Sequence, residues 1–109
     1  MKIPESVRIS GVEYRVSHEP NVNDGERLCY GTINYDLAEI DISSTTPMSY
    51  EMKCITLWHE ILHGIIRAYG VDVQNEETVV EMLSRGIYQV LQDNGKRFYD
   101  IEEGQTNAR

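Results

Sequence analysis

Residues 50–70 have the sequence YEMKCITLWHEILHGIIRAYG, and this stretch decides how the rest of the chain must be arranged. Apolar residues recur in it every three or four positions, which is the period of an amphipathic helix. Ser49 precedes it as a candidate N-cap, and Gly70 follows at the position where a left-handed residue commonly ends a helix. We therefore predict a helix from about Tyr50 to Tyr69.

His59 and His63 lie four residues apart in this helix, and Glu60 follows the first histidine directly. Residues at that spacing share one helix face, so both imidazoles can converge on one ion. Glu60 lies about 100° further around the helix, beside the place where a metal-bound water would sit. The pattern HExxH therefore predicts two metal ligands and a neighbouring general base. Gly64 leaves room for another group to approach closely.

A catalytic zinc site takes three protein ligands and keeps a fourth position for water. The third ligand is expected from a second helix, predicted from about Glu76 to Asp93 and ended by Asn94 and Gly95. This helix must pack against the first to bury its apolar stripe. The predicted stripe comprises Val79, Val80, Leu83, Ile87, Val90 and Leu91.

Two glutamates of the second helix are alternatives for the third ligand. Glu76 lies near the centre of the apolar stripe, where a carboxylate is costly without a partner such as a metal. Glu77 has Glu81 one turn later, and Glu81 is suited to accept a hydrogen bond from a ligand histidine. Both Glu76 and Glu77 also suit the positive end of a helix dipole. Asp72 is too close in sequence to the first helix to fold back over the ion.

The residues before the first helix alternate between apolar and polar, as strands do. Residues 6–18 form two such runs separated by Gly11, and residues 28–42 form a hairpin that turns at 34–36. The segment 19–26 is rich in turn residues, with room for a short helix. We predict the α+β class: a small antiparallel sheet of three to four strands followed by two packed helices.

The chain of 109 residues is long enough for one domain, which we assign to residues 1–95. Residues 96–109 are polar and show little periodicity, so we expect a partly ordered C-terminal tail.

Eighteen acidic residues against ten Lys and Arg give a formal net charge of −8, which argues against nucleic acid as a partner. The apolar runs are too short and too polar for a membrane span, and the N-terminus does not resemble a signal peptide. Cys29 and Cys54 lie far apart and outside any CxxC pattern, so we expect reduced thiols in a cytoplasmic protein.

At residues 57–64 (LWHEILHG) and 75–81 (NEETVVE) the chain resembles the gluzincin-type zinc metallopeptidases. It is most similar to small bacterial and phage proteins related to the ImmA/IrrE metallopeptidases. In gluzincins a glutamate after HExxH completes the metal site, and an acidic residue one turn later supports it. The resemblance thus favours Glu77 as the third ligand and Glu81 as its support, with Glu76 as the alternative. It also implies a minimal zincin-like domain in a bacterial cytoplasm, encoded by the host, a phage or a prophage.

The expected activity is zinc-dependent hydrolysis of a peptide bond, with His59, His63 and a glutamate holding Zn²⁺ and Glu60 as general base. A peptide or protein substrate is expected to lie along the strand around Leu37–Ile42 by strand addition. Four aromatic residues are candidate donors to the oxyanion: Tyr35, Tyr50, Tyr69 and Tyr88.

Two other functions compete with the peptidase. One is a non-catalytic interaction module of a phage or prophage that keeps zinc as a structural staple. The other is an interaction protein in which the HExxH pattern is incidental. Glu60 favours catalysis, because a structural site has no need of a base. The sequence does not determine the oligomeric state.

Overall fold

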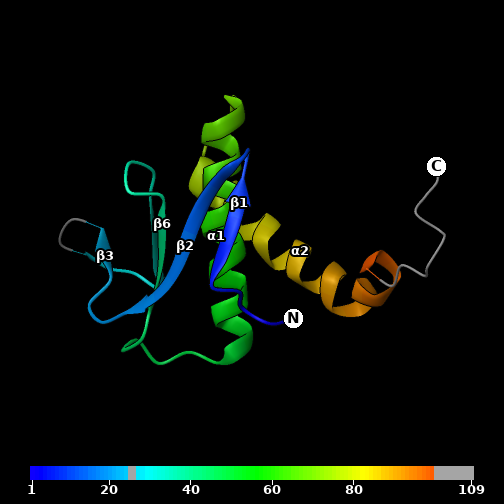
Figure 1. Ribbon diagram of the computed structural model, residues 1–109, viewed down its shortest axis with the longest axis horizontal. Coiled ribbons are helices and arrows are strands. Elements are labelled where there is room, and N and C mark those ends of the chain that lie inside the picture. Colours follow the sequence, from blue (N-terminus) through cyan, green and yellow to red (C-terminus); the bar gives the residue numbers. More distant parts are fainter. Residues whose placement is uncertain (25–26, 100–109) are drawn as a thin grey trace.

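The strands of the protein precede its two helices (Figure 1), in a computed structural model that describes residues 1–24 and 27–99. The α+β prediction, a four-stranded sheet followed by two packed helices, is confirmed. The strands are β1 (Ser6–Ile9), β2 (Val12–Glu19), β3 (Asn23–Asp24), β4 (Arg27–Leu28), β5 (Gly31–Asn34) and β6 (Glu39–Ser43). The helices are α1 (Tyr50–Tyr69) and α2 (Glu76–Tyr99).

The main sheet has the strand order β1-β2-β6-β5 and is mixed, not purely antiparallel as expected. β1 pairs with β2, and β5 with β6, in the antiparallel sense, but β2 and β6 run parallel. The segment between β2 and β5 forms the small β3–β4 pair where a turn-rich loop was expected. After this pair the chain enters the sheet at its edge as β5, and β6 then pairs between β5 and β2.

β6 lies inside the sheet because it is more apolar on one face than β5, the other strand of the hairpin. Ile40 and Ile42 have no exposed surface and point toward α1. Glu39 and Asp41 alternate with them, and so lie on the opposite face of the sheet. The expectation that a substrate pairs with the strand around Leu37–Ile42 was therefore wrong, because β6 already has a neighbouring strand on each side. The free edges belong to β1 and β5.

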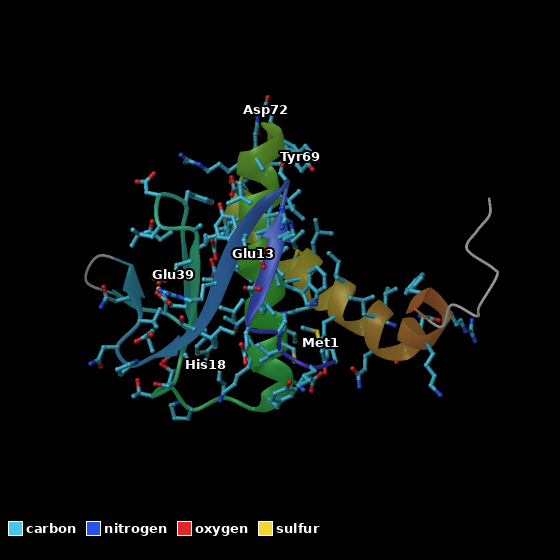
Figure 2. The ribbon with its side chains drawn as sticks, viewed as in Figure 1. Met1, Glu13, His18, Glu39, Tyr69 and Asp72 are labelled. Atoms are coloured by element: carbon cyan, nitrogen blue, oxygen red, sulfur yellow. The ribbon has the colours of Figure 1, made fainter. Side chains whose placement is uncertain are left out.

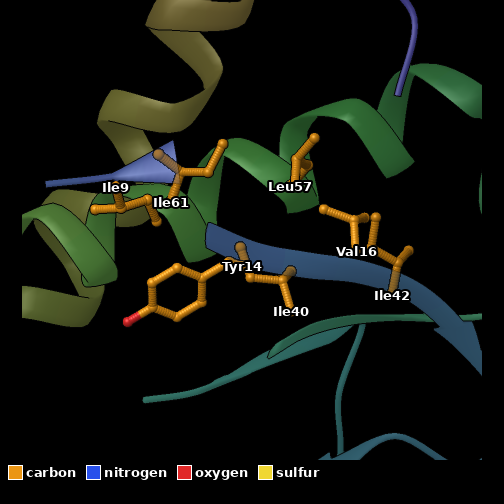
Figure 3. Packing of buried hydrophobic residues seen from close by; sticks show 7 residues of the cluster. All are labelled: Ile9, Tyr14, Val16, Ile40, Ile42, Leu57 and Ile61. Atoms are coloured by element: carbon orange, nitrogen blue, oxygen red, sulfur yellow. The ribbon is translucent and has the colours of Figure 1, made fainter. Parts of the chain in front are cut away.

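The core forms where the inner face of the sheet meets α1 (Figure 3). β1, β2 and β6 supply five of its buried side chains and α1 supplies two. These residues are Ile9, Tyr14, Val16, Ile40, Ile42, Leu57 and Ile61. Burial of a large aliphatic side chain contributes about 1.5–3 kcal/mol, so this cluster fixes α1 against the sheet.

α1 has the bounds predicted from the sequence, and its ends are formed by the predicted residues. The Ser49 side chain accepts a hydrogen bond of 3.0 Å from the backbone N–H of Met52. Gly70 has φ of +64°, the left-handed conformation that ends a helix at little cost for glycine. The helix thus ends before the loop that leads into α2.

α2 is longer than predicted and buries a different face. It continues through Gly95 to Tyr99, so residues 96–99 belong to the helix; the rest of the expected tail, 100–109, lies outside the described residues. The face toward α1 carries Val80, Ser84 and Tyr88, all buried. Two members of the predicted stripe, Leu83 and Val90, are exposed. The C-terminal half of α2 extends away from the sheet (Figure 1).

Cys29 and Cys54 form no disulfide within the described residues. Cys54 is buried beside Ile55 and Tyr88 in a second apolar cluster. Neither helix of the described residues is long and apolar enough to cross a membrane.

Candidate metal centre

Gly64 sets the distance between α1 and the sheet beside the histidine pair. A Cβ atom at this position would lie 2.8 Å from Cδ1 of Ile9 and 3.1 Å from Cδ1 of Ile33. Both distances are shorter than ordinary van der Waals contact, so a side chain here would push the sheet away. The close approach anticipated at Gly64 is therefore that of core side chains from β1 and β5.

His59 and His63 lie one turn apart on α1 and point into the same space. Their Nε2 atoms are 3.3 Å apart, and the ring centroids 4.9 Å apart at an interplanar angle of 64°. Only 13% of the His59 side chain and 15% of the His63 side chain are exposed. The two imidazoles are thus held together in a largely buried position, which the i, i+4 spacing predicted.

Glu77 joins the histidine pair from the first turn of α2. Its Oε2 lies 2.9 Å from Nε2 of His59 and its Oε1 lies 3.0 Å from Nε2 of His63. The short loop 71–75 makes this possible by reversing the chain, and Asn75 at its end has φ of +56°. His59, His63 and Glu77 each offer a ligand atom, and these atoms lie within 4.8 Å of one another.

Glu76 and Glu81 contact the opposite nitrogens of the two rings. Oε2 of Glu76 lies 2.6 Å from Nδ1 of His63, and Oε1 of Glu81 lies 3.1 Å from Nδ1 of His59. Arg85 in turn donates to Glu81 at 2.7 Å. Each imidazole thus has a carboxylate on the side away from its neighbour, the arrangement that orients histidines bound to metals.

These contacts leave three acceptors facing one another. When each Nδ1 carries the proton that it donates to its carboxylate, both Nε2 atoms present lone pairs. The Glu77 carboxylate adds negative charge between them, so the arrangement requires a proton or a cation. Ligand atoms about 2.05 Å from a tetrahedral zinc ion lie about 3.3 Å apart, and the two Nε2 atoms have that separation. The donor set therefore fits a divalent metal.

The same carboxylates change the proton affinity of His63. Burial lowers its pKa, but the hydrogen bond to Glu76 and the charges of Glu60 and Glu77 outweigh burial, so the pKa of His63 is raised. The site thus attracts positive charge, whether this is carried by a proton or by a metal ion.

Glu60 of α1 is buried, with 6% of its surface exposed. The cause is β5, which lies over this side of the helix at Gly31. A Cβ atom at Gly31 would lie 2.6 Å from Cγ2 of Thr56 and 3.5 Å from Oε2 of Glu60. Gly31 was not predicted from the sequence to be part of the site, although a glycine inside a strand often marks such a close backbone approach.

A cavity of about 1050 Å³ surrounds β5 and includes the histidine pair, Glu60, Glu77 and Glu81. Its other walls come from α1, β5, β6 and Asn23 of β3. A cavity of this size is at the upper end of the range for small-molecule and peptide sites.

Of the four tyrosines considered as oxyanion donors, Tyr35 is the one that lines this cavity. The guanidinium of Arg67 lies 4.3 Å from the centre of its ring. Burial, followed by the charge of Glu76, raises the pKa of the Tyr35 hydroxyl, which keeps its proton available for donation.

The other three tyrosines lie elsewhere. Tyr50 accepts a hydrogen bond from the backbone of Ile3, and Tyr88 packs in the cluster with Cys54. Tyr69 and Asp72 lie at the C-terminal end of α1 (Figure 2), and neither lines the cavity.

Comparison of the chain with protein-family models, curated proteins and solved structures finds no match. The geometry defines the class of site: two imidazoles and a carboxylate arranged for a metal, beside a buried glutamate and a cavity.

Proposed function

We propose that the protein is a zinc-dependent hydrolase that cleaves peptide bonds. The convergence of three acceptor groups on one point carries this proposal, because His59, His63 and Glu77 need positive charge there, which a divalent metal ion supplies. Glu76 and Glu81 then hold the two imidazoles in the tautomer that binds metal. A zinc ion at such a site lowers the pKa of water toward neutrality and polarises a carbonyl group.

Glu60 is the general base of the proposed reaction. Its carboxylate lies in the wall of the same cavity, and its burial strengthens its interaction with a positive centre. It accepts a proton from the attacking water and later returns this proton to the departing amine. Tyr35 donates a hydrogen bond to the oxygen on which negative charge develops.

β5 is the strand on which the peptide docks in this proposal. Tyr30, directly before β5, accepts a hydrogen bond of 2.8 Å from the backbone N–H of Ser43. Hydrogen-bonded pairs alternate along an antiparallel ladder, so Thr32 and Asn34 also face β6 with their backbone groups. The N–H and C=O groups of Gly31 and Ile33 therefore point toward the free edge of the sheet. An extended peptide can pair with them next to Glu60.

Metal analysis tests the first part of the proposal. Protein purified without added zinc should contain about one zinc ion per chain, and His59→Ala should abolish this content. A protein without a divalent metal, which also takes up none on dialysis against zinc, would refute the metal centre.

Catalysis is tested with a quenched fluorescent peptide library. The zinc-loaded protein should hydrolyse members of the library, and Glu60→Gln should keep the zinc but lose hydrolysis by a factor of about 10²–10⁴. Unchanged hydrolysis in Glu60→Gln would exclude Glu60 as the base.

A zinc-stabilised module without catalysis is the second candidate, favoured by one observation: the three ligand groups join α1 to α2. In that case zinc would raise the melting temperature by the same amount in the protein and in Glu60→Gln, and neither would hydrolyse any peptide.

A further inference from the structure

Asp41 contains a buried polar atom without a hydrogen-bond partner, a condition that no other side chain in the described part of the chain shares. The atom is Oδ1, and the residue lies in the middle of β6 and lines the cavity. Burial, followed by the charges of Glu39 and Glu19, raises the pKa of this carboxyl. Buried acceptors are normally paired, so an acceptor left without a donor points to a missing partner.

The neighbouring carboxylate on the same face is already neutralised. Glu39 forms an ion pair with Arg15 of β2, which stands opposite it in the sheet. At the next position on this face, Ser17 stands opposite Asp41 on β2 and Thr32 stands opposite it on β5. Neither of these neighbours carries a positive charge, and the more distant charge of Arg15 does not outweigh the burial of Asp41 and the charges of Glu39 and Glu19.

A peptide strand on the edge of β5 would extend this row of residues. The peptide residue opposite Thr32 would point to the outer face of the sheet, as Thr32 and Asp41 do. Strands lie about 4.8 Å apart, so this residue would stand about 9.6 Å from Asp41. The four-carbon stem of a lysine, or the longer side chain of an arginine, can cross Thr32 with its apolar part and bring its charge to Asp41.

Neither Lys nor Arg is among the described residues that line the cavity, so no lining side chain competes with a basic residue of the peptide for Asp41. We propose that Asp41 is a specificity-determining residue that selects peptides with Lys or Arg at the position opposite Thr32. The proposal rests on the peptide docking and cleavage proposed above, and it names the substrate class: extended segments of basic proteins or peptides.

The test measures binding to the zinc-loaded Glu60→Gln protein, which should not cleave the probe. Two fluorescein-labelled heptapeptides are compared by anisotropy: Gly-Thr-Val-Lys-Val-Thr-Gly and the same peptide with Gln in place of Lys. The lysine peptide should bind about fivefold more tightly, as expected for a charge-assisted hydrogen bond in a partly exposed setting. Adding Asp41→Asn should reduce this ratio to about one.

The control is Glu5→Gln in the same background, which removes one negative charge from the exposed Glu5, beside β1 at the opposite edge of the sheet. It should keep the fivefold ratio, whereas a general effect of net charge would lower the ratio equally in both variants. Thermal unfolding should show that Asp41→Asn is at least as stable as its parent, so lost discrimination cannot come from misfolding.

The results separate this inference from the proposed function. Equal binding of the two peptides, or an unchanged ratio in Asp41→Asn, would overturn the role of Asp41 and leave peptide hydrolysis standing. Absence of binding by either peptide would overturn docking on β5 and the inference with it. Hydrolysis of the peptide library without a preference for Lys or Arg would also refute the inference alone.

Discussion

Replacing the three glutamates of α2 one at a time should rank their roles at the metal centre. Glu77 contacts the two Nε2 atoms, which face the proposed metal position, whereas Glu76 and Glu81 contact the outer Nδ1 atoms. Loss of a group that orients a ligand histidine costs about 10–100-fold in metal affinity. Loss of a ligand should cost more, so Glu77→Ala should weaken zinc binding by more than about 100-fold.

This ranking translates into melting temperatures. With free zinc buffered at about 1,000 times the dissociation constant, the bound ion stabilises the native protein by about 4.1 kcal/mol. A 100-fold loss of affinity removes about 2.7 kcal/mol of this and a 10-fold loss about 1.4 kcal/mol. At about 4–8 °C for each kcal/mol, Glu77→Ala should melt about 10–20 °C lower than the unsubstituted protein in the zinc buffer.

Zinc affinity is measured by competition with a chelator, and melting by calorimetry with and without zinc. The matched control is Glu51→Ala, because Glu51 is an exposed first-turn glutamate of α1, as Glu77 is of α2. If Glu77 only complemented the helix dipole, the two variants would behave alike. A larger loss of affinity in Glu76→Ala than in Glu77→Ala would refute the assignment of the third ligand.

Three further predictions concern packing, ionisation and catalysis. Gly64→Ala should lower the free energy of unfolding by about 1–3 kcal/mol because the new Cβ would meet Ile9 at 2.8 Å. At Gly86 an added Cβ would have no heavy atom within 4 Å, so Gly86→Ala should instead raise the free energy of unfolding by up to about 1 kcal/mol. Urea titration measures both changes. The folded protein holds the Asp41 proton to a higher pH than the unfolded chain, since burial and then Glu39 and Glu19 outweigh Arg15. The raised pKa of Asp41 lowers the free energy of unfolding as pH rises above the ordinary aspartate range. Asp41→Asn should therefore have a higher melting temperature than its parent at pH 7 and nearly the same melting temperature at pH 3. The opposite trend in melting temperature would contradict this prediction. Tyr35→Phe should lower kcat at least about tenfold while leaving zinc affinity unchanged, and unchanged kcat would remove Tyr35 from the mechanism.

The helices were predictable because their signals are local, whereas the sheet order was not. Ser49 and Gly70 mark the ends of α1 through contacts within a few residues of the chain. The parallel pairing of β2 with β6 instead joins residues about 24 positions apart, such as Arg15 and Glu39. No local pattern distinguishes a hairpin that adds to the sheet from one that inserts its second strand next to β2. The identity of the edge strand therefore had to come from the structure.

The predicted end of α2 at Asp93 was wrong, because Asn94 and Gly95 do not stop the helix. A glycine in a helix costs only about 1 kcal/mol relative to alanine, and Gly95 does not adopt a left-handed conformation here. The Asn94 side chain donates to the carbonyl of Val90, a contact within the helix.

The choice between Glu76 and Glu77 shows how far helix phase can carry an argument about a site. Phase relative to the expected stripe favoured Glu76 as the carboxylate in need of a partner, and Glu76 does have one, Nδ1 of His63. Glu77 is 74% exposed, so burial gives no hint of its role, yet its two oxygens bridge both Nε2 atoms. Which oxygen reaches which nitrogen depends on how the loop 71–75 sets α2 against α1. A burial argument thus identifies the glutamate that contacts the outer nitrogen of His63, whereas the carboxylate that faces both Nε2 atoms belongs to an exposed neighbour. For this reason Glu76→Gln and Glu77→Gln should differ in kind. The first should lower zinc affinity moderately, because the acceptor of His63 loses its negative charge but can still accept the hydrogen bond. The second should leave an incomplete ligand set at any pH. Zinc titrations at pH 6, 7 and 8 would decide between them, and parallel affinity losses in the two variants at all three pH values would show that this division of roles is wrong.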